Sequence, residues 1–249
     1  RERASPGDPI FVTTFWRVDG PPPEESVVRL ELLASDGSMV RAYDLPLTAS
    51  WHPPSAWEPG DVWRGQQLIH LPADLNTAEY TWALSISTSK RPLSSFGSLS
   101  VQAPARVFAS PPTDLSLNAR LGDVATLVGA SLAPPASSIA PGSPLTVTLV
   151  WRAEVETTTS YSVFVHLLDP DGKLIAQSDG IPDTWSRPTT GWVSGEYITD
   201  EHLLVLPPDA APGTYELVTG MYVSSGVERL TTPDGRDTIA VTALAVEAR

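Results

Sequence analysis

The chain contains an internal repeat that covers a whole domain. When the numbering is shifted by 135, the stretch from Pro9 to about Ser87 aligns without a gap with the stretch from Pro144 to Tyr222. The identical pairs include Trp16 and Trp151, Asp36 and Asp171, Trp57 and Trp192, Gly60 and Gly195, and Tyr80 and Tyr215. Because the matches keep turn residues in register over this length, they indicate the duplication of a folding unit rather than of a short motif.

The repeat predicts how the chain divides into domains. A length of 249 residues suffices for two domains of ordinary size. We predict a first repeat over residues 1–110, a linker over 111–120 and a second repeat over 121–249. Arg1 aligns only with Ala136, so the first repeat has no counterpart of the strand expected over residues 123–132. That first strand is either missing or supplied by another segment.

Alternating apolar and polar residues predict strands throughout. Residues 145–152 and 161–167 show the period of two that is typical of half-buried strands. Turn sequences such as Asp169-Pro170-Asp171-Gly172 separate them. Further strands are expected over 198–206, 215–222 and 238–246, and the first repeat should end in a strand over 99–107. About seven short strands per repeat without a helical period predict an all-β chain: two tandem antiparallel β-sandwiches of immunoglobulin or fibronectin type.

Composition excludes several classes of function. The chain has no cysteine, which excludes disulfides and thiolate zinc sites. A net charge of −13 with scattered basic residues argues against a nucleic-acid partner. No run of about 18 apolar residues is present, so a membrane would be reached only through segments outside this sequence. The chain begins at Arg1 without a visible signal peptide, and we expect it to be part of a longer protein.

No catalytic motif is present, and no catalytic residue, metal ligand or cofactor is predicted. The sequence has neither a Gly-x-Ser-x-Gly elbow nor a His-Glu-x-x-His metal motif. His166 and His202 fall on strands, where they are expected at the surface or at an edge. Asp200 and Glu201 should point to opposite faces of their strand.

Other acidic residues are assigned to turns. Asp169 and Asp171 resemble the start of a calcium loop, but the later ligands of such a loop are absent, which favours a hairpin turn. Glu196 and Asp61 correspond across the repeat, and each follows a turn glycine.

The tryptophans are the candidate binding residues, and sugars are the ligands that flat aromatic faces accept by stacking. Candidate glycan contacts are Trp51, Trp57, Trp63, Trp185 and Trp192. Trp57 and Trp192 match across the repeat, each three residues before a glycine, which favours an indole packed over a turn. The other three have no aromatic counterpart, and two interpretations stay open for them: an exposed platform, or caps on the ends of the sandwiches. Trp16 and Trp151 are predicted core anchors.

The second repeat resembles a known module. It carries Pro-Gly-x-Pro-Leu-x-Val-x-Leu-x-Trp-Arg over residues 141–152, then Tyr-Ser-Val-Phe-Val-His-Leu-Leu-Asp-Pro-Asp-Gly from Tyr161, and later Leu206-Pro207 and Pro212-Gly213-Thr214-Tyr215. These motifs resemble the β-sandwich module at the C-terminal end of bacterial membrane glycosyltransferases related to dolichyl-phosphate-mannose protein mannosyltransferases. The first repeat resembles it more weakly. The resemblance implies an accessory domain on the outer side of the membrane, and it carries over no catalytic residue.

Three hypotheses for the function follow. The first is a non-catalytic, extracytoplasmic accessory region of a larger membrane-associated, glycosyltransferase-like protein, in contact with a glycan or another cell-envelope polymer. The second is a structural spacer or protein-interaction module without a ligand. The third is a glycoside hydrolase whose carboxylates meet only in the folded chain. The sequence leaves the oligomeric state open.

Overall fold

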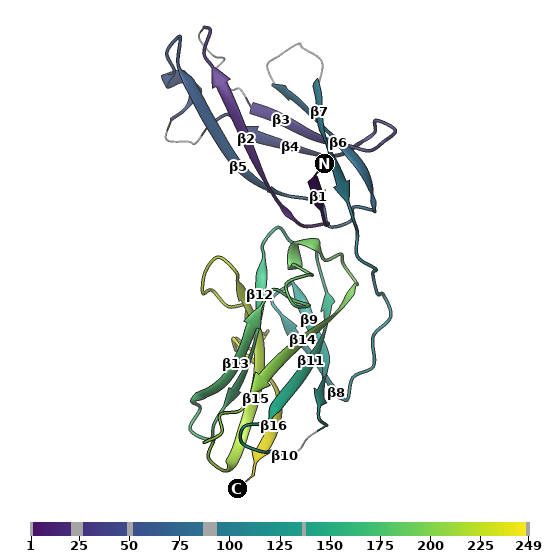
Figure 1. Cartoon of the computed structure of the whole chain (residues 1–249), viewed down its shortest axis with the longest axis vertical. Helices are drawn as coiled ribbons and strands as arrows, with labels where there is room; N and C mark the ends of the chain where they lie inside the picture. The colour runs from purple at the N-terminus through teal and green to yellow at the C-terminus, as the bar shows by residue number, and fades with distance from the viewer. Residues whose placement is uncertain (1, 21–26, 49–51, 87–93, 136–137, 248–249) are drawn as a thin grey trace. The chain divides into compact units, whose positions relative to one another are not determined.

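The structure confirms the all-β prediction (Figure 1). It is a computed structural model that describes residues 2–20, 27–48, 52–86, 94–135 and 138–247. Strands and two single-turn 3₁₀ helices make up the regular structure of these residues. None of their helices has the length and apolar character needed to cross a membrane. The chain divides into two compact units, unit 1 over residues 1–104 and unit 2 over residues 105–249.

Unit 2 is a sandwich of a four-stranded and a five-stranded sheet. The first sheet has the order β14 (Tyr197–Val205), β11 (Pro144–Ala153), β9 (Ala125–Ala133) and β8 (Leu115–Leu121). The second has the order β10 (Ser138–Ile139), β16 (Ile239–Val246), β15 (Gly213–Val223), β12 (Tyr161–Leu168) and β13 (Leu174–Gly180). Neighbouring strands are antiparallel except for the short parallel pair of β10 and β16.

Among its described residues, unit 1 has a five-stranded sheet like that of unit 2 and a second sheet of two strands. The larger sheet has the order β1 (Glu2–Ala4), β7 (Ser94–Val101), β6 (Ala78–Ile86), β3 (Val27–Leu33) and β4 (Met39–Pro46). The smaller sheet pairs β2 (Pro9–Arg17) with β5 (Val62–His70). Among the described residues, unit 1 therefore has no counterpart of β8 or β9. A shift of 135 places the counterparts of both strands before residue 1.

The repeat in the sequence is a repeat in structure. Shifted by 135, β5 coincides with β14 from end to end, and the 3₁₀ helix η1 (Pro54–Ala56) coincides with η2 (Thr189–Gly191). The last strands, β7 and β16, are related by a shift of 145 instead, since Ala78 pairs with Val101 and Gly213 with Val246. A longer connection between β15 and β16 accounts for this shift, and it explains why the aligned stretch ends at about Ser87.

Two sequence-based boundaries are wrong. The predicted linker over 111–120 overlaps β8, which pairs with β9 as the edge strand of unit 2. Leucine and alanine alternate there with Ser116, Asn118 and Arg120, the pattern of a half-buried strand. The strand expected over 99–107 instead ends at Val101. Pro104 lacks an N–H donor and suits the extended segment that follows.

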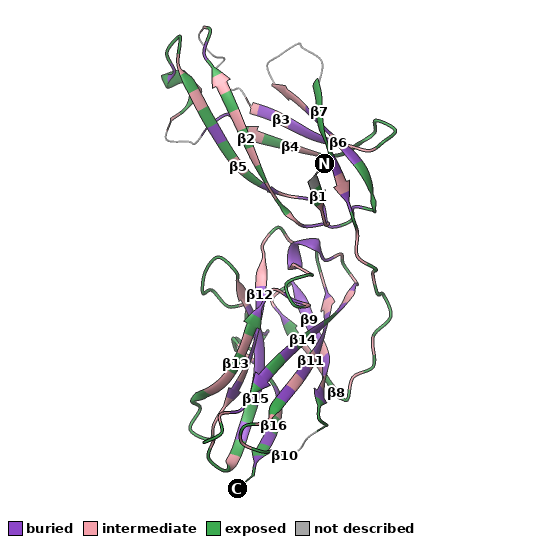
Figure 2. Cartoon of the chain, in the orientation of Figure 1, coloured by how far each residue is buried: buried purple, intermediate pink, exposed green. Residues whose placement is uncertain are grey.

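Burial follows the strand alternation, as the purple residues in Figure 2 show. In unit 2 one cluster joins both sheets, and Trp151 lies within it with 0% of its surface exposed. In unit 1 the buried residues form two separate clusters. Trp16 packs against the smaller of these clusters and is only half-buried. The core-anchor prediction is therefore confirmed for Trp151 and only partly for Trp16.

Candidate functional site

The five candidate tryptophans do not gather at one place. Trp51 lies outside the described residues. Trp57 and Trp192 are buried, and Trp63 is half-buried. Trp185 has 70% of its surface exposed. Among the tryptophans that the structure describes, Trp185 is thus the one whose indole is open to a ligand.

Trp57 and Trp192 have equivalent structural positions, at the ends of η1 and η2. The N–H of each tryptophan donates to the carbonyl three residues earlier, which closes the 3₁₀ turn. Gly60 and Gly195 follow with φ values of 98° and 81°, a conformation that favours glycine. Both indoles contribute to the cores. The interpretation as packed turn residues holds, and neither tryptophan is available as a glycan contact.

Trp63 packs inside one end of unit 1. Its ring lies 6.4 Å from that of Trp57 in a stacked arrangement, and 3.9 Å from the ring of His52. Its indole Nε1 donates to Asp61 Oδ2 at 3.2 Å. These contacts occupy the side chain, so of the two interpretations left open for Trp63 the structure favours packing.

Trp185 belongs to a turn with an unusual backbone. Asp183, Thr184 and Trp185 have φ values of 54°, 52° and 72°, so three consecutive residues are left-handed. For residues other than glycine this conformation costs about 1–2 kcal/mol each, because Cβ approaches the following carbonyl oxygen. Such conformations persist where the surroundings over-determine them, and they cluster at functional sites. The turn residues 181–187 therefore need anchors.

The first anchor lies within the turn. The N–H of Trp185 donates to the carbonyl of Ile181 at 3.0 Å. The N–H of Ser186 donates to the carbonyl of Asp183 at 3.0 Å, and the Ser186 hydroxyl donates to the Asp183 carboxylate at 2.7 Å. These bonds satisfy polar groups that a left-handed stretch would otherwise leave to water.

The second anchor is a buried polar chain between β13 and β14. Asp200 Oδ1 accepts the N–H of Asp183 at 2.8 Å, and its Oδ2 lies 3.0 Å from Nε2 of His202. Nδ1 of His202 lies 3.1 Å from the hydroxyl of Ser178. Asp200 is 1% exposed and His202 5% exposed. Because a buried carboxylate needs several partners, this chain fixes the turn to the interior of unit 2.

The same three side-chain types form the triad of serine hydrolases, but here their surroundings indicate a structural role. A catalytic serine must face a substrate cleft that also contains oxyanion donors. Asp200 and His202 are instead enclosed, and the second oxygen of Asp200 is used by the backbone of the turn. We assign the chain of Ser178, His202 and Asp200 to support of the turn.

The third anchor follows the turn. Glu196 is fully buried, and its carboxylate receives Arg187 Nη2 at 2.5 Å and Arg106 Nη1 at 2.6 Å. The carbonyl of Arg187 also accepts the indole N–H of Trp192 at 2.9 Å. Removing one partner from a buried ion pair costs about 3–5 kcal/mol. Arg187 thus holds the end of the turn firmly against the core.

Glu196 also has the turn role that its sequence position predicted. Its Oε2 accepts the N–H of Val193 at 3.2 Å. In unit 1, Asp61 accepts the N–H of Glu58 at 2.9 Å in the same arrangement. Asp169 likewise serves its hairpin, since its Oδ1 accepts the N–H groups of the second and fourth residues after it. These three carboxylates are confirmed as turn residues.

Trp185 itself rests against the end of β13. A methyl group placed on Gly180 would lie 3.2 Å from Nε1 of the indole and 3.3 Å from Cε2. The side of the indole that carries Nε1 therefore lies against the backbone of Gly180, and a side chain at position 180 would press on the ring. The remainder of the ring is open to solvent, beside the exposed Thr184 and Ser186.

The sequence indicated Trp185 as a candidate contact but did not indicate the buried residues that fix its turn. His202 was expected at the surface, and that expectation is wrong. Along β14, Asp200 and His202 alternate in phase with Ile198 and Leu204, which are buried apolar residues, so all four point inward. Glu201 points outward, as predicted. The alternation along β14 is enough to place His202 on the inward face. The polar side chain of His202 led to the expectation that it lies at the surface.

Comparison with known proteins identifies no relative by sequence. No family model matches the chain, and neither does any curated protein. A membrane-anchored protein from Corynebacterium diphtheriae matches in structure with a TM-score of 0.29 and 12% identity, over 100% of this chain and 58% of that one. A glycosyl hydrolase family 2 member from Bacteroides cellulosilyticus matches with a TM-score of 0.26 and 9% identity, over 93% of this chain and 26% of that one.

The chain spans less than two thirds of each of these structures. Within the described residues, no cluster of three or more histidine, aspartate or glutamate side chains is placed to hold a metal ion.

Proposed function

We propose that this chain is a non-catalytic accessory region that contacts glycan through Trp185. We further propose that it works on the outer side of the cell membrane, as part of a larger membrane-associated protein of glycosyltransferase type. The resemblance of the second repeat to the C-terminal module of such proteins supports this setting. The contact itself is supported by the structure of unit 2.

The observation that carries the proposal is an exposed indole on a rigid support. A flat aromatic surface held in one orientation can stack on a sugar ring without losing further side-chain freedom on binding. Trp185 is 70% exposed, while its turn is fixed by the buried Asp200 and by Arg187. An indole that only capped the sandwich would have been covered, as that of Trp192 is. The three strained residues of the turn have an evident use if they present this side chain.

A glycan array followed by calorimetric titration tests the proposal. We expect the full chain to bind at least one glycan, and Trp185→Ala to weaken that binding at least tenfold. Trp185→Tyr keeps a flat ring and should retain binding within a few-fold. Phe108→Ala is the matched control, because Phe108 is another exposed aromatic residue of unit 2, with 61% of its surface open.

Two results would contradict the proposal. The absence of binding to every glycan at millimolar concentration would favour the spacer hypothesis. Equal affinities for Trp185→Ala and the unmodified chain would place any glycan contact elsewhere. The carboxylates of Glu196 and Asp200, which are nearly or fully buried, are bound by arginine and histidine, and this favours a structural role for them over that of a hydrolase's carboxylate pair.

A further inference from the structure

The outer face of the five-stranded sheet of unit 2 carries a buried aromatic ring. Phe164 alternates along β12 with Val163 and Val165, which belong to the core between the sheets, so its side chain points away from that core. It is nevertheless only 1% exposed. Its cover must therefore come from side chains on the outer face of the sheet, and not from the opposite sheet.

Two basic side chains lie against the ring of Phe164. The guanidinium carbon of Arg229 is 4.4 Å from the ring centroid. The imidazole centroid of His166 is 4.6 Å from the same centroid, and that of Tyr222 is 6.4 Å away. Arg229 belongs to the connection between β15 and β16, residues 224–238. A permanent cation and a group that can become a cation thus contact one ring, and we call these four residues the outer cluster.

The charged groups around His166 come from β13, β15 and the connection, while β16 contains no charged residue. They are Asp179, Glu216, Arg229 and Asp237. Oδ1 of Asp179 lies 3.5 Å from Nε2 of the imidazole, and Nη1 of Arg229 donates to Asp237 Oδ2 at 3.1 Å. Burial lowers the pKa of His166 below its ordinary value of 6.5; the charge of Asp179 works against this shift, and that of Arg229 adds to it. The folded cluster therefore favours the neutral imidazole.

Unit 1 has a permanent ion network at the equivalent place. A shift of 135 puts Arg29, Glu31 and Asp44 at the positions that correspond to Phe164, His166 and Asp179. Arg29 Nε donates to Glu31 at 3.0 Å, and its Nη1 donates to Asp44 at 3.1 Å. Carboxyl groups ordinarily have pKa values of about 4, so this network keeps its charges above about pH 5. Unit 2 instead places an imidazole here, the side chain whose charge ordinarily changes between about pH 5 and pH 8.

We propose that the outer cluster is a pH-sensitive cover of Phe164, in which neutral His166 allows Arg229 to lie over the ring and protonated His166 displaces it. In the acidic form Asp179 holds the imidazolium, and Arg229 leaves the ring together with Asp237. The connection loosens as a result, and the ring of Phe164 becomes exposed. The proposal rests on the outer face of the sheet and makes no use of the glycan contact at Trp185.

The direction of the response follows from proton binding. Because the closed cluster disfavours the proton, any form in which His166 reaches water takes it up at higher pH. As the pH falls through about 6.5, the free energy needed to open the cluster therefore decreases. Local opening of this kind involves a part of the unit and does not require that unit 2 unfolds.

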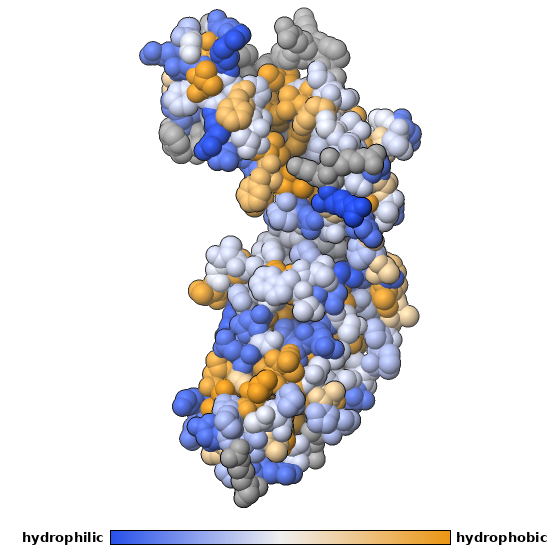
Figure 3. Space-filling model, viewed as in Figure 1, coloured by the Kyte–Doolittle hydropathy of each residue, from blue (hydrophilic) through white to orange (hydrophobic). Residues whose placement is uncertain are grey.

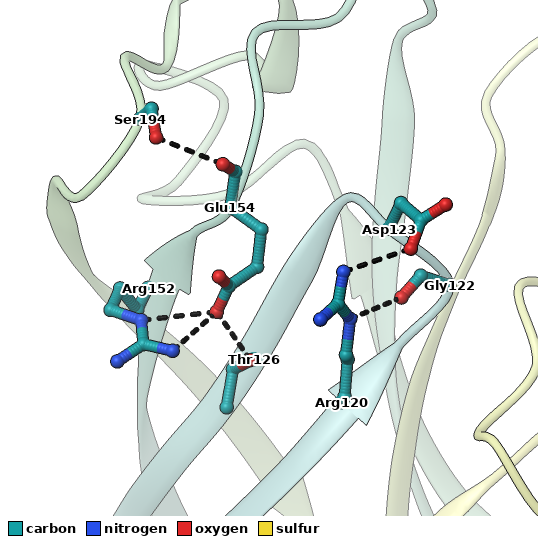
Figure 4. A network of polar contacts seen from close by, with 7 residues as sticks. All are labelled: Arg120, Gly122, Asp123, Thr126, Arg152, Glu154 and Ser194. Carbon is teal, nitrogen blue, oxygen red and sulfur yellow. Dashed lines mark hydrogen bonds and ion pairs between the residues drawn. The ribbon is translucent and has the colours of Figure 1, made fainter.

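A second acid-sensitive network of unit 2 responds at lower pH. Figure 4 shows the carboxylate of Glu154, which accepts Arg152 Nη2 at 2.7 Å and the hydroxyl of Thr126. These contacts lower the pKa of Glu154 below 4.5. Glu154 thus keeps its charge down to about pH 5, and the response of His166 can be measured separately above that pH.

NMR titration of the full chain from pH 7.5 to pH 5.0 tests the proposal. A dye for hydrophobic surface would not isolate Phe164, because unit 1 already exposes such surface beside β2, as Figure 3 shows. The ring current of Phe164 should shift the side-chain protons of Arg229 upfield while the guanidinium lies over the ring. We expect this shift to decrease on acidification with a midpoint below pH 6.5, and the imidazole signals of His166 to titrate with the same midpoint. The amide of Leu230, which donates to Met221 at 2.9 Å, should exchange at least tenfold faster at pH 5.0, after correction for intrinsic exchange.

Variants separate this response from general acid effects. His166→Gln removes the titrating group and should keep the Arg229 shift constant over the whole range. Asp179→Asn removes the charge that favours the imidazolium, so the midpoint should move to lower pH. His70→Gln, in unit 1, is the matched control and should leave the Arg229 signals as they are. An Arg229 shift that stays constant in the unmodified chain, or that changes equally in His166→Gln, would overturn the proposal, as would a higher midpoint in Asp179→Asn.

Discussion

Trp16 and Trp151 occupy the same register position on equivalent strands, yet Trp151 is completely enclosed and Trp16 is only half-buried. The difference lies in the neighbouring strand. Leu127 of β9 pairs opposite Trp151, and no described strand lies beside Trp16 at that edge. The Nε1 of Trp16 is bonded instead to the hydroxyl of Thr14 at 2.9 Å and to the carbonyl of Leu47 at 3.2 Å.

Replacing the two indoles should therefore have unequal effects. We expect Trp151→Ala to lower the free energy of unfolding of unit 2 by about 3–5 kcal/mol, as is usual for a fully buried tryptophan. Trp16→Ala should lower that of unit 1 by a smaller amount, because less of its surface leaves water on folding. Urea titrations of the full chain, followed by NMR signals from each unit, measure the two values. An equal or larger loss for Trp16→Ala would contradict this difference in packing.

Asp200 should control the mobility of Trp185. Asp200→Ala removes the acceptor for the N–H of Asp183 and leaves His202 without its carboxylate, so about 1–3 kcal/mol per unsatisfied group should be lost. The turn should loosen, and ¹⁵N relaxation of the Trp185 indole N–H, measured by NMR in the otherwise unmodified chain, should show faster local motion. Glu201→Ala, the exposed neighbour on the same strand, is the control and should change neither property. Unchanged motion in Asp200→Ala would show that the buried chain does not hold the turn.

Glu154 should make unit 2 sensitive to acid. Burial alone would raise the pKa of its carboxyl, but the hydrogen bonds from Thr126 and Arg152 and the charge of Arg152 outweigh burial and lower the pKa below its ordinary value of 4.5. As the pH falls from about 5, the unfolded chain takes up this proton before the folded chain does, so stability is lost. Glu154→Gln should flatten the fall in unfolding free energy between about pH 5 and pH 3. A steeper fall for Glu154→Gln would reverse the assigned direction.

We expect a side chain at position 220 to clash with the ring of Phe164. An added Cβ would lie 2.5 Å from Cζ of Phe164 and 3.0 Å from the carbonyl oxygen of Asp237. Phe164 is 1% exposed and lies beneath the guanidinium of Arg229, so its ring has little room to move. We expect Gly220→Ala to destabilise unit 2 by about 1–3 kcal/mol. Gly226→Ala, where nothing lies within 4 Å of the added atom, should be nearly neutral in the same thermal unfolding assay.

The sequence predicts the architecture well because local patterns determine it. Turn glycines such as Gly60 and Gly195 and the alternation along strands such as β14 locate most of the expected strands to within a residue or two. The strand expected over 99–107 is an exception, since β7 covers 94–101. The strand β8 was missed although Leu115 and Leu121 frame a clear alternation, because the prolines before it suggested a linker. The alternation over residues 115–121 predicts a strand, and the prolines at positions 111 and 112 predict a linker; here the strand pattern is the correct one.

The supports of Trp185 are harder to predict. No local preference favours a left-handed Thr184 or Trp185, since tertiary contacts with Asp200 and Arg187 impose that backbone. Ser178 lies near His202 because β13 and β14, which belong to opposite sheets, pack against each other at one side of the sandwich. No local pattern in the sequence indicates this contact. Likewise, Trp185 is exposed and Trp192 is buried because of the residues that the fold places around each of them.

Amide hydrogen exchange along β2 and β11 in the full chain tests most directly whether β2 is unpaired on the side where β11 pairs with β9. If β2 has a single partner strand, the amides that point toward β5 should be protected, and the alternate amides should exchange at least about a hundredfold faster. Along β11, both sets should be protected, because β9 and β14 flank it. Uniform protection along β2, equal to that of β11, would show that the edge is already covered and would contradict this account.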